Sequence, residues 1–305
     1  RLVGSEMCIR DRNEAPCLFD QSLLRTRLRR AVNKGAADFL LHRVADDLEI
    51  RLQALARPFN TVADIGTPGP LAAEKLCASQ RFTHIFRQAP IIETVGQGDW
   101  VSLVGETDLV SFAPQSLDAA ISLLALHTVD DLPGFLAQIK RALKADGLFM
   151  ACLLGGQTLH ELRASFAKAE IECEGGLSPR VSPFAELRDL GQLMQRAGFA
   201  LPVIDTEVIT VRYATPLALL NDLRNMGATN ALIERRKSPL RRKTLFRALE
   251  LYAENYSDSD GRIRATFECL WVSGWTPHDS QQKPLPPGSA KARLADALKT
   301  SEGTL

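Results

Sequence analysis

The chain has 305 residues, a formal net charge of +1 at pH 7, and 45% hydrophobic and 24% charged residues. This composition is that of a globular protein with enough apolar material for a core, in one large domain or two ordinary ones. The near-neutral charge creates no overall field toward nucleic acid, and no apolar run reaches the roughly 18 residues that a membrane-spanning helix needs. We therefore expect no nucleic-acid partner and no integral membrane segment.

The six cysteines show neither a Cys-x-x-Cys pair nor a histidine at ligand spacing. We expect free thiols in a reducing, cytoplasmic compartment and no metal site. The first twelve residues, RLVGSEMCIRDR, resemble the translated adaptor sequence that recurs at the ends of proteins from metagenomic assemblies. We therefore interpret residues 1–12 as a sequencing artefact and exclude them from fold reasoning, which leaves the natural N-terminus and any targeting signal undetermined.

Two helices are predicted before the first strand. Phe19–Val32 is basic and amphipathic, as is typical of a short helix lying on a domain. Ala36–Leu55 carries leucine and alanine at three- and four-residue steps, which predicts a longer helix with one apolar stripe. Arg57 precedes Pro58 and ends that helix, because the residue before a proline disfavours helical geometry.

The stretch Thr61–Leu71, TVADIGTPGPL, organises the rest of the chain. An apolar run with one acid, Asp64, opens into a turn with Gly66 and Gly69, and Leu71–Cys77 predicts a helix. A strand that ends in a glycine turn and feeds a helix is how parallel α/β sheets hold nucleotide-type cofactors. Because two prolines stand where the common fingerprints have glycine, the stretch fits a ligand loop and an ordinary strand–helix turn equally well.

Strands and helices then alternate. The predicted segments are a second strand at Phe82–Phe86, a third at Trp100–Val104, a fourth at Leu117–Leu124, a helix at Leu132–Leu143 and a fifth strand at Leu148–Leu154. This alternation over residues 60–154 predicts a parallel sheet with right-handed crossovers.

The end of the second strand departs from the usual nucleotide site. In many nucleotide-binding sheets an acid at this point accepts hydrogen bonds from a ribose hydroxyl. Here Arg87 and Gln88 follow Phe86, and the nearest acid, Glu93, lies beyond Pro90. The sequence therefore lacks a conventional ribose clamp.

The second half predicts further helices and two long strands. The segments are a helix at Thr158–Glu170, a helix capped by Ser182 with Pro183 at its first position, a strand at Val203–Tyr213, helices at Pro216–Met226 and Leu240–Tyr256, and a strand at Thr266–Trp275. We interpret residues 13–275 as one domain with a helical insertion at about 216–256, and 276–305 as a tail with a short helix at 290–298.

Basic side chains gather in two stretches, Arg25–Lys34 and Arg235–Arg247. Two interpretations stay open for them: solvated helix faces, or a docking surface for an acidic partner. Arg180 likewise fits either a contact to an acidic substrate or a loop charge.

Read together, these segments resemble a class I S-adenosylmethionine-dependent methyltransferase over residues 60–154. The residues that carry the resemblance are Asp64, Gly66 and Gly69 after the first strand, Glu106 and Thr107 after the third, Asp118 before the fourth, and the turn Leu143–Gly147 before the fifth. The resemblance implies an α/β fold with a doubly wound, mostly parallel seven-stranded sheet and a helical insertion before the last strand.

A narrower resemblance spans most of the chain. The segments FDQSLLRTRLRRA, LALHTVDDLPGFLAQIKRALKADG, LLGGQTLHELR, EGGLSPRVSPFAELRDLGQLMQRAGF and SGWTPHDSQQKP are similar to bacterial relatives of the mitochondrial complex I assembly factor. That family has a methyltransferase fold and an arginine hydroxylase activity on a complex I subunit. Malonyl-acyl-carrier-protein O-methyltransferase is a more distant relative.

The resemblance implies S-adenosylmethionine as cofactor and a site for it. The implied cofactor-binding residues are Asp64, Gly66, Gly69, Glu106, Thr107 and Ser122. His127 follows the fourth strand, where the carboxyl edge of a parallel sheet opens into a ligand crevice, and is the candidate catalytic residue. A hydrogen-bonded structural role for His127 stays open beside that of a base or substrate contact.

Proline cannot adopt positive φ, so Pro68 and Pro70 require the cofactor loop to follow another path. Three functions remain under consideration. The first is a methyltransferase acting on a protein or small-molecule acceptor, and the second is a complex I assembly factor that hydroxylates or chaperones a subunit. The third is a nicotinamide oxidoreductase, which rests only on the α/β pattern and Arg87.

Overall fold

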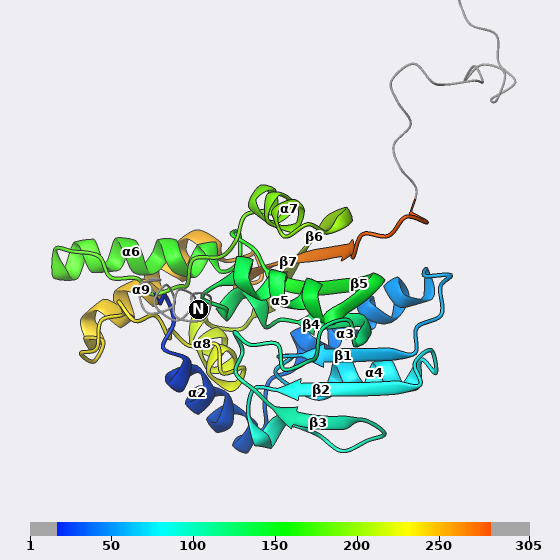
Figure 1. Ribbon diagram of the computed structural model, residues 1–305. Coiled ribbons are helices and arrows are strands. Elements are labelled where there is room, and N and C mark those ends of the chain that lie inside the picture. Colours follow the sequence, from blue (N-terminus) through cyan, green and yellow to red (C-terminus); the bar gives the residue numbers. More distant parts are fainter. Residues whose placement is uncertain (1–16, 282–305) are drawn as a thin grey trace, which may run out of the picture.

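The structure is a computed structural model that describes residues 17–281 (Figure 1). The adaptor-like residues 1–12 and the helix expected at 290–298 lie outside this range. In chain order the helices and strands are α2 (Gln21–Asn33), α3 (Phe39–Gln53), β1 (Thr61–Ile65), α4 (Leu71–Ala78), β2 (His84–Ala89), η1 (Ile92–Thr94), β3 (Val101–Val104), β4 (Leu117–Leu123), η2 (Leu126–Thr128), α5 (Leu132–Ala142), β5 (Leu143–Leu154), α6 (His160–Glu174), α7 (Leu187–Arg196), β6 (Ala200–Tyr213), α8 (Pro216–Asn225), α9 (Arg242–Tyr256) and β7 (Ile263–Trp275).

A seven-stranded sheet forms the centre, with the strand order β3-β2-β1-β4-β5-β7-β6. Strands β1 to β5 pair in parallel, and β7 runs antiparallel to both β5 and β6. The doubly wound, mostly parallel α/β sheet expected from the sequence is confirmed, with α8 and α9 between the last two strands in the chain.

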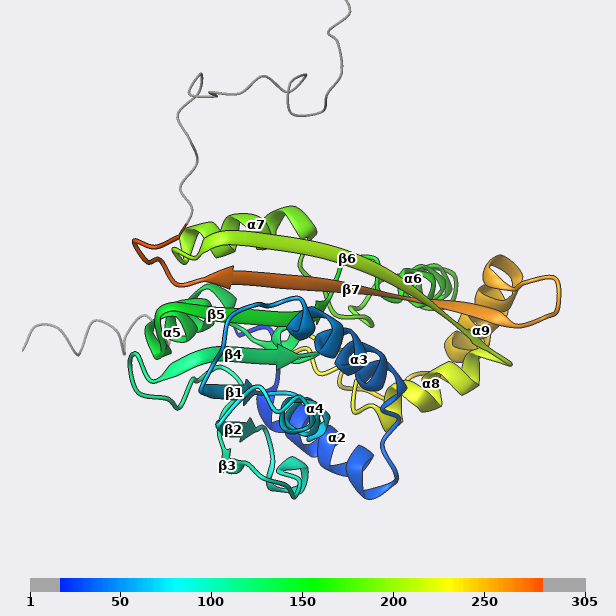
Figure 2. The ribbon, with the colours of Figure 1, turned by 90° about the vertical axis from the view of Figure 1, so that its right-hand side faces the viewer.

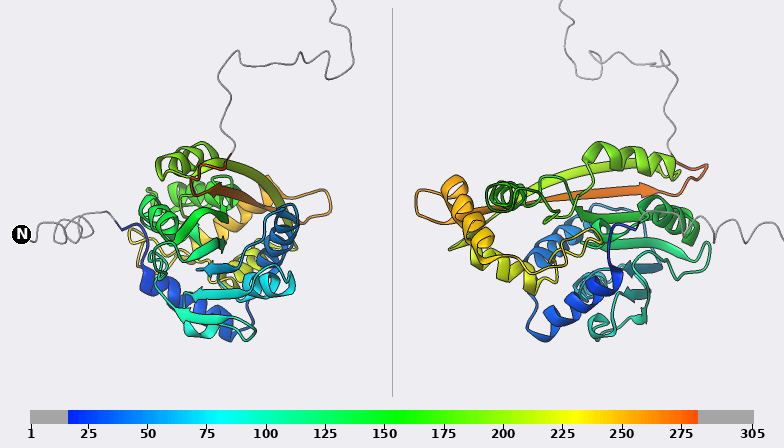
Figure 3. Two further views of the ribbon diagram at one scale, coloured as in Figure 1. Left: turned by 45° about the vertical axis from the view of Figure 1, so that its right-hand side comes forward. Right: turned by 90° about the vertical axis from the view of Figure 1, so that its left-hand side faces the viewer.

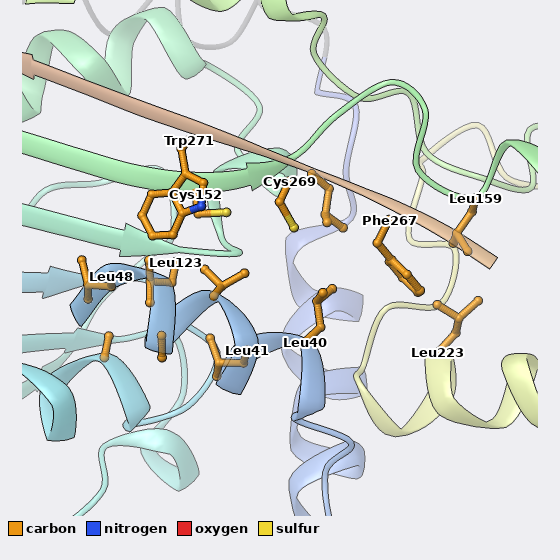
Figure 4. Close-up of a cluster of buried hydrophobic side chains, with 14 of the residues drawn as sticks. Leu40, Leu41, Leu48, Leu123, Cys152, Leu159, Leu223, Phe267, Cys269 and Trp271 are labelled. Atoms are coloured by element: carbon orange, nitrogen blue, oxygen red, sulfur yellow. The ribbon is translucent and has the colours of Figure 1, made fainter. Parts of the chain in front are cut away.

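Helices cover both faces of the sheet, as Figure 2 shows. On one face the buried side chains of α3 and α4 pack against β1, β4, β5 and β7, and on the other face α5 and α7 do so. Figure 4 shows Leu41 and Leu48 of α3 on the same side of the sheet as Leu123, Cys152 and Trp271. All five of these side chains are buried, so α3 is fixed by its apolar stripe.

The helices α6 and α9 pack together at the end of the molecule toward which the parallel strands point (Figures 1 and 3). At the opposite edge, Asp118 joins β4 to β1: its carboxylate accepts hydrogen bonds from the N–H groups of Asn60 and Thr61 at 3.1 and 2.9 Å, and it pairs with Lys144 at 2.8 Å. This aspartate of the methyltransferase-like pattern therefore has a structural contact far from the ligand edge.

Several predicted boundaries are wrong. Strand β5 begins at Leu143 rather than Leu148, because Leu143 pairs with Leu117 of β4; the turn expected at Leu143–Gly147 therefore lies within the strand, at a shift in the pairing register.

Two other boundaries also have local causes. The helix expected to begin at Pro183 begins at Leu187, because Ala185 forms a strand-like bridge with Gly155 and keeps the chain extended. Strand β2 runs to Ala89 rather than ending at Phe86, because it hydrogen-bonds β1 on one side and β3 on the other. Among the described residues, no helix is both long enough and apolar enough to cross a membrane.

Candidate functional site

The loop after β1 turns sharply at Gly66. Its φ of +77° lies in the left-handed region, and a Cβ there would stand 3.3 Å from the Cβ of Ala125, so glycine suits the position in both respects. The next residue, Thr67, is buried: its hydroxyl donates to Asp64 and accepts from the N–H of Leu123 at 3.1 Å. These bonds tie the loop to both neighbouring strand ends.

Arg87 lies directly opposite Asp64 in the sheet, and both side chains are fully buried. Its Nη1 donates to the Asp64 carboxylate, its Nε and Nη2 donate to the carbonyl of Thr94 at 3.1 and 2.9 Å, and Nη2 also donates to the carbonyl of Thr67 at 2.9 Å. Burial raises the pKa of the Asp64 carboxyl, while the Arg87 charge and the Thr67 hydroxyl oppose that rise. The pair therefore keeps a costly buried carboxylate satisfied.

This geometry corrects the interpretation of Arg87 as a residue at the ribose position. Because β2 continues for three residues past Phe86, Arg87 belongs to the strand, and its side chain is fully buried in the protein. Pro90, the residue after the strand, faces the ligand edge instead. Arg87 is buried against Asp64 and does not fill the space at the ligand edge. Pro68 and Pro70 form part of the wall around that space and do not fill it either.

A cavity of about 400 Å³ opens at the carboxyl edge of the sheet, and we call it the apolar cavity. It is bounded by α2 and α3, by the loops after β1, β2, β3 and β4, and by residues 226–228 after α8. Its lining residues include Leu24, Arg25, Leu28, Val32, Leu40, Leu41, Gly66, Pro68, Gly69, Pro70, Glu74, Pro90, Glu93, Thr107, Leu124, Ala125, His127, Met226, Gly227 and Ala228. Ligands of open α/β sheets bind at this edge.

The structure brings four of the seven expected site residues to the apolar cavity: Gly66, Gly69, Thr107 and His127. The other three, Asp64, Glu106 and Ser122, lie outside its lining. Asp64 is bonded to Arg87 and Thr67, as described above. Glu106 is well exposed and pairs with Arg25 at 3.1 Å, so it reaches the cavity only through that partner. Ser122 is fully buried on β4, and within the described part of the chain its hydroxyl has no hydrogen-bond partner.

His127 lies on the short turn η2 that follows β4, in the wall of the apolar cavity. Its Nδ1 is buried without a hydrogen-bond partner among residues 17–281, and its ring packs against Phe184 with the centroids 5.9 Å apart. Burial lowers the pKa of His127 from 6.5 to about 4, so the imidazole is neutral at pH 7. A neutral imidazole carries one ring nitrogen that donates a hydrogen bond and one that can accept a hydrogen bond or a proton.

Several residues of this site were not identified from the sequence. The apolar stripe of α2 forms one wall, and Glu93 and Arg25 bring charge to it. Glu93 is held by Arg29 of α2 at 2.5 Å. The sequence signal that could have identified Glu93 as a site residue was its position as the first acid after the second strand. Within residues 17–281, no group of three or more histidine, cysteine, aspartate or glutamate side chains is arranged to hold a metal ion.

The methyltransferase domain family matches residues 78–151 of the chain. Among solved structures, the YcgJ protein of Bacillus subtilis aligns with a TM-score of 0.53 at 14% identity, over 78% of this chain and 99% of that one. A candidate methyltransferase of Bacillus halodurans aligns with a TM-score of 0.53 at 13% identity, over 76% and 98%. These likenesses show the fold.

Curated relatives cover most of the chain. Arginine-hydroxylase NDUFAF5 of Danio rerio is 35% identical over 92% of this chain and 90% of its own length, and that of Homo sapiens is 36% identical over 92% and 84%. Malonyl-[acyl-carrier protein] O-methyltransferase of Halorhodospira halophila is 31% identical over 84% and 89%. The chain therefore belongs to the methyltransferase-fold family that includes arginine-hydroxylase NDUFAF5.

Proposed function

We propose that the apolar cavity binds S-adenosylmethionine and that the chain transfers its methyl group to a protein or small-molecule acceptor. The observation that carries the proposal is the convergence of Gly66, Gly69, Thr107 and His127 on one cavity at the carboxyl edge of the sheet. These four residues come from three separate loops, which lie together only because the parallel strands end at the same edge.

The residues present fit such a ligand. A volume of about 400 Å³ lies within the roughly 300–1,000 Å³ of small-molecule sites, and the walls are mostly apolar with a few polar groups. The main chain at Gly66 and Gly69 would hold the amino-acid portion, and Thr107 would lie beside the base. Glu93 supplies the carboxylate that a ribose diol needs, in place of the acid missing from β2.

The bound cofactor would supply an activated methyl group on a sulfonium, and positioning the acceptor is then the main task of the protein. The wall formed by α2, α3 and residues 226–228 would shield a bound ligand from solvent on that side. His127, which is neutral at pH 7 and lies in the cavity wall, would contact the acceptor and could accept its proton.

Calorimetric titration with S-adenosylmethionine and with its demethylated product tests the proposal. The variant Gly69→Leu places a side chain in the cavity, where the new Cβ would meet Leu41 at an ordinary 3.5 Å. The matched control is Gly176→Leu, where a Cβ meets nothing within 4 Å and which lies outside the cavity lining. We expect binding by the wild type and Gly176→Leu and at least about tenfold weaker binding by Gly69→Leu. No binding by the wild type at millimolar ligand would overturn the proposal.

A second candidate function is a respiratory complex I assembly factor that hydroxylates an arginine of a subunit or acts as its chaperone. It is favoured by the 35% identity to arginine-hydroxylase NDUFAF5 over 92% of the chain. Mass spectrometry of complex I subunits from a deletion strain separates the two functions, because a lost methyl group and a lost oxygen atom differ in mass. Unchanged subunit masses together with normal assembly of complex I would exclude this second function.

A further inference from the structure

The two basic stretches of the sequence meet in space. Arg27 and Arg30 of α2, with Lys34 directly after the helix, lie beside Arg224 of α8 and the segment Asn230–Lys237. Figure 1 shows α2 and α8 as neighbours. Two cavities of about 400 Å³ each open here, and both include Arg27 in their lining; we call them the basic cavities. The first is lined by Arg27, Arg180, Asn230, Arg235, Arg236 and Lys237, and the second by Arg27, Arg30, Lys34, Arg224 and Thr229.

The positive charge of the basic cavities is only partly balanced. In the first cavity Arg180 pairs with Glu170, Arg235 with Asp20, and Arg236 with Glu174. In the described part of the chain, no ion pair joins a carboxylate to any of the remaining cations, which are Arg27, Arg30, Lys34, Arg224 and Lys237. Among the described residues, neither cavity has an acidic side chain in its lining. An excess of unpaired positive charge therefore faces the two hollows.

Arg27 is the residue that both basic cavities share. Its Nη1 donates to the carbonyl oxygens of Thr229, at 2.6 Å, and Asn230. Burial lowers the pKa of the Arg27 guanidinium, and the charges of Arg235 and Arg30 act in the same direction against the opposing effect of Asp20. The main chain thus holds a partly desolvated cation among other cations, an arrangement that a bound anion would stabilise.

We propose that the basic cavities form a binding site for a small molecule that carries a multiply charged phosphate group. Arg27, which both cavities share, would contact the phosphate oxygens. Guanidinium groups present paired N–H donors that match phosphate oxygens, and this site offers several of them in a concave setting. Within residues 17–281 the side chains that line the basic cavities are all polar or charged, whereas protein partners are anchored mainly by aromatic and apolar side chains. The occupant is therefore a compact anion rather than the surface of an acidic protein.

The site is separate from the apolar cavity, although the two share a wall. The opposite side of α2, with Leu24 and Leu28, lines the apolar cavity, and so do residues 226–228 next to Thr229. A Cβ at Gly227 would stand 3.0 Å from the Cα of Leu28, so the wall is tightly packed. The proposal does not depend on methyl transfer, because it rests on the outer side of this wall.

Calorimetric titration of the full chain with inorganic pyrophosphate at low and at physiological salt tests the proposal. Arg27→Met removes a charge and the paired N–H donors that match phosphate oxygens, so we expect it to weaken pyrophosphate binding at least about tenfold, and Arg27→Lys, which keeps the charge, to weaken it less. The double variant Arg30→Gln/Lys34→Gln removes exposed cations of the second cavity and keeps the test valid if Arg27→Met does not fold.

The matched control is Arg242→Gln/Lys243→Gln, which removes the same charge from exposed positions on α9 outside both cavities. We expect this control to bind pyrophosphate as the wild type does. Equal weakening by the two double variants, or no pyrophosphate binding by the wild type at millimolar concentration, would overturn the proposal. A hexaglutamate peptide that binds more tightly than pyrophosphate, and loses affinity in Arg27→Met, would overturn it in favour of an acidic protein partner.

Discussion

Two arginines of this molecule are held by main-chain carbonyls but differ in what completes their surroundings. Arg87 donates to the carbonyls of Thr67 and Thr94 and also has a carboxylate partner, Asp64, with both charged groups fully buried. Arg27 donates to the carbonyls of Thr229 and Asn230 and has no carboxylate within ion-pair distance among residues 17–281.

This difference makes Arg87 a structural cation and leaves Arg27 suited to bind a ligand. A buried ion pair with all its donors satisfied leaves nothing for an external anion to complete. A cation that the fold places beside other cations, at the edge of two hollows, leaves its charge uncompensated. Arginine count and spacing in the sequence do not reveal this distinction, because it depends on which carboxylates the fold brings near.

Breaking the buried pair should have the largest effect. Arg87→Met leaves the Asp64 carboxylate buried without its cation, and we expect it to lower the free energy of unfolding by about 3–5 kcal/mol. Urea denaturation measures this change. The double variant Asp64→Asn/Arg87→Met should recover part of this loss. If the double variant loses as much free energy of unfolding as Asp64→Asn and Arg87→Met lose together, the assignment of the pair is wrong.

The glycine beside that pair gives the next largest effect. In Gly66→Ala the alanine must adopt a positive φ, which costs about 1–2 kcal/mol, and its Cβ crowds Ala125. We therefore expect the free energy of unfolding to fall by about 2–3 kcal/mol in total. Gly175→Ala, near the basic cavities, shares the positive φ of +71° but would meet nothing within 4 Å. If thermal or urea unfolding shows equal losses for the two variants, the close approach of the loop to Ala125 is wrong.

His127 lacks the partner that Asp64 has, and this should appear as a dependence of stability on pH. Because burial lowers its folded-state pKa to about 4 from 6.5, the unfolded chain binds the proton more readily. Stability from this group is complete above pH 6.5 and falls as the pH drops toward 4, by about 1–2 kcal/mol after allowance for exposure to the cavity. His127→Gln should flatten the stability profile across this window, and an unaltered profile would contradict the burial of a neutral imidazole.

The smallest effect belongs to an exposed counterpart of the buried pair. Arg29 and Glu93 lie 2.5 Å apart with side chains 47% and 27% exposed. Exposed pairs typically contribute about 0.2–1 kcal/mol, so Arg29→Met should lower the free energy of unfolding by less than about 1 kcal/mol in the same urea experiment. A loss as large as that of Arg87→Met would show that burial does not distinguish the two arginines.

The sequence predicted the sheet better than the site. Alternating apolar segments identified the parallel strands from Thr61 to Leu154, because burial on both faces leaves a continuous apolar run. The positions Gly66, Gly69 and Thr107, which the family resemblance implied, and His127, which follows the fourth strand, all line the apolar cavity, since strand ends in a parallel sheet share one edge.

The partners of individual side chains were not predictable in the same way. The pairing of Arg87 with Asp64 depends on cross-strand register, and an error of three residues in the end of β2 concealed it. The roles of Leu24, Leu28 and Met226 in the cavity wall depend on contacts between segments about 200 residues apart, which periodicity does not report.

The wall between the apolar and basic cavities has a consequence for how the protein is made. It consists of α2 and residues 226–228, which belong to early and late parts of the chain. The wall can form only after these two segments, about 200 residues apart, have come together. A nascent chain halted before Met226 has the parallel strands but neither enclosure. A ligand of either cavity would therefore find its site complete only after α8 has left the ribosome, and a small ligand that favours the closed wall would act on the last stage of folding.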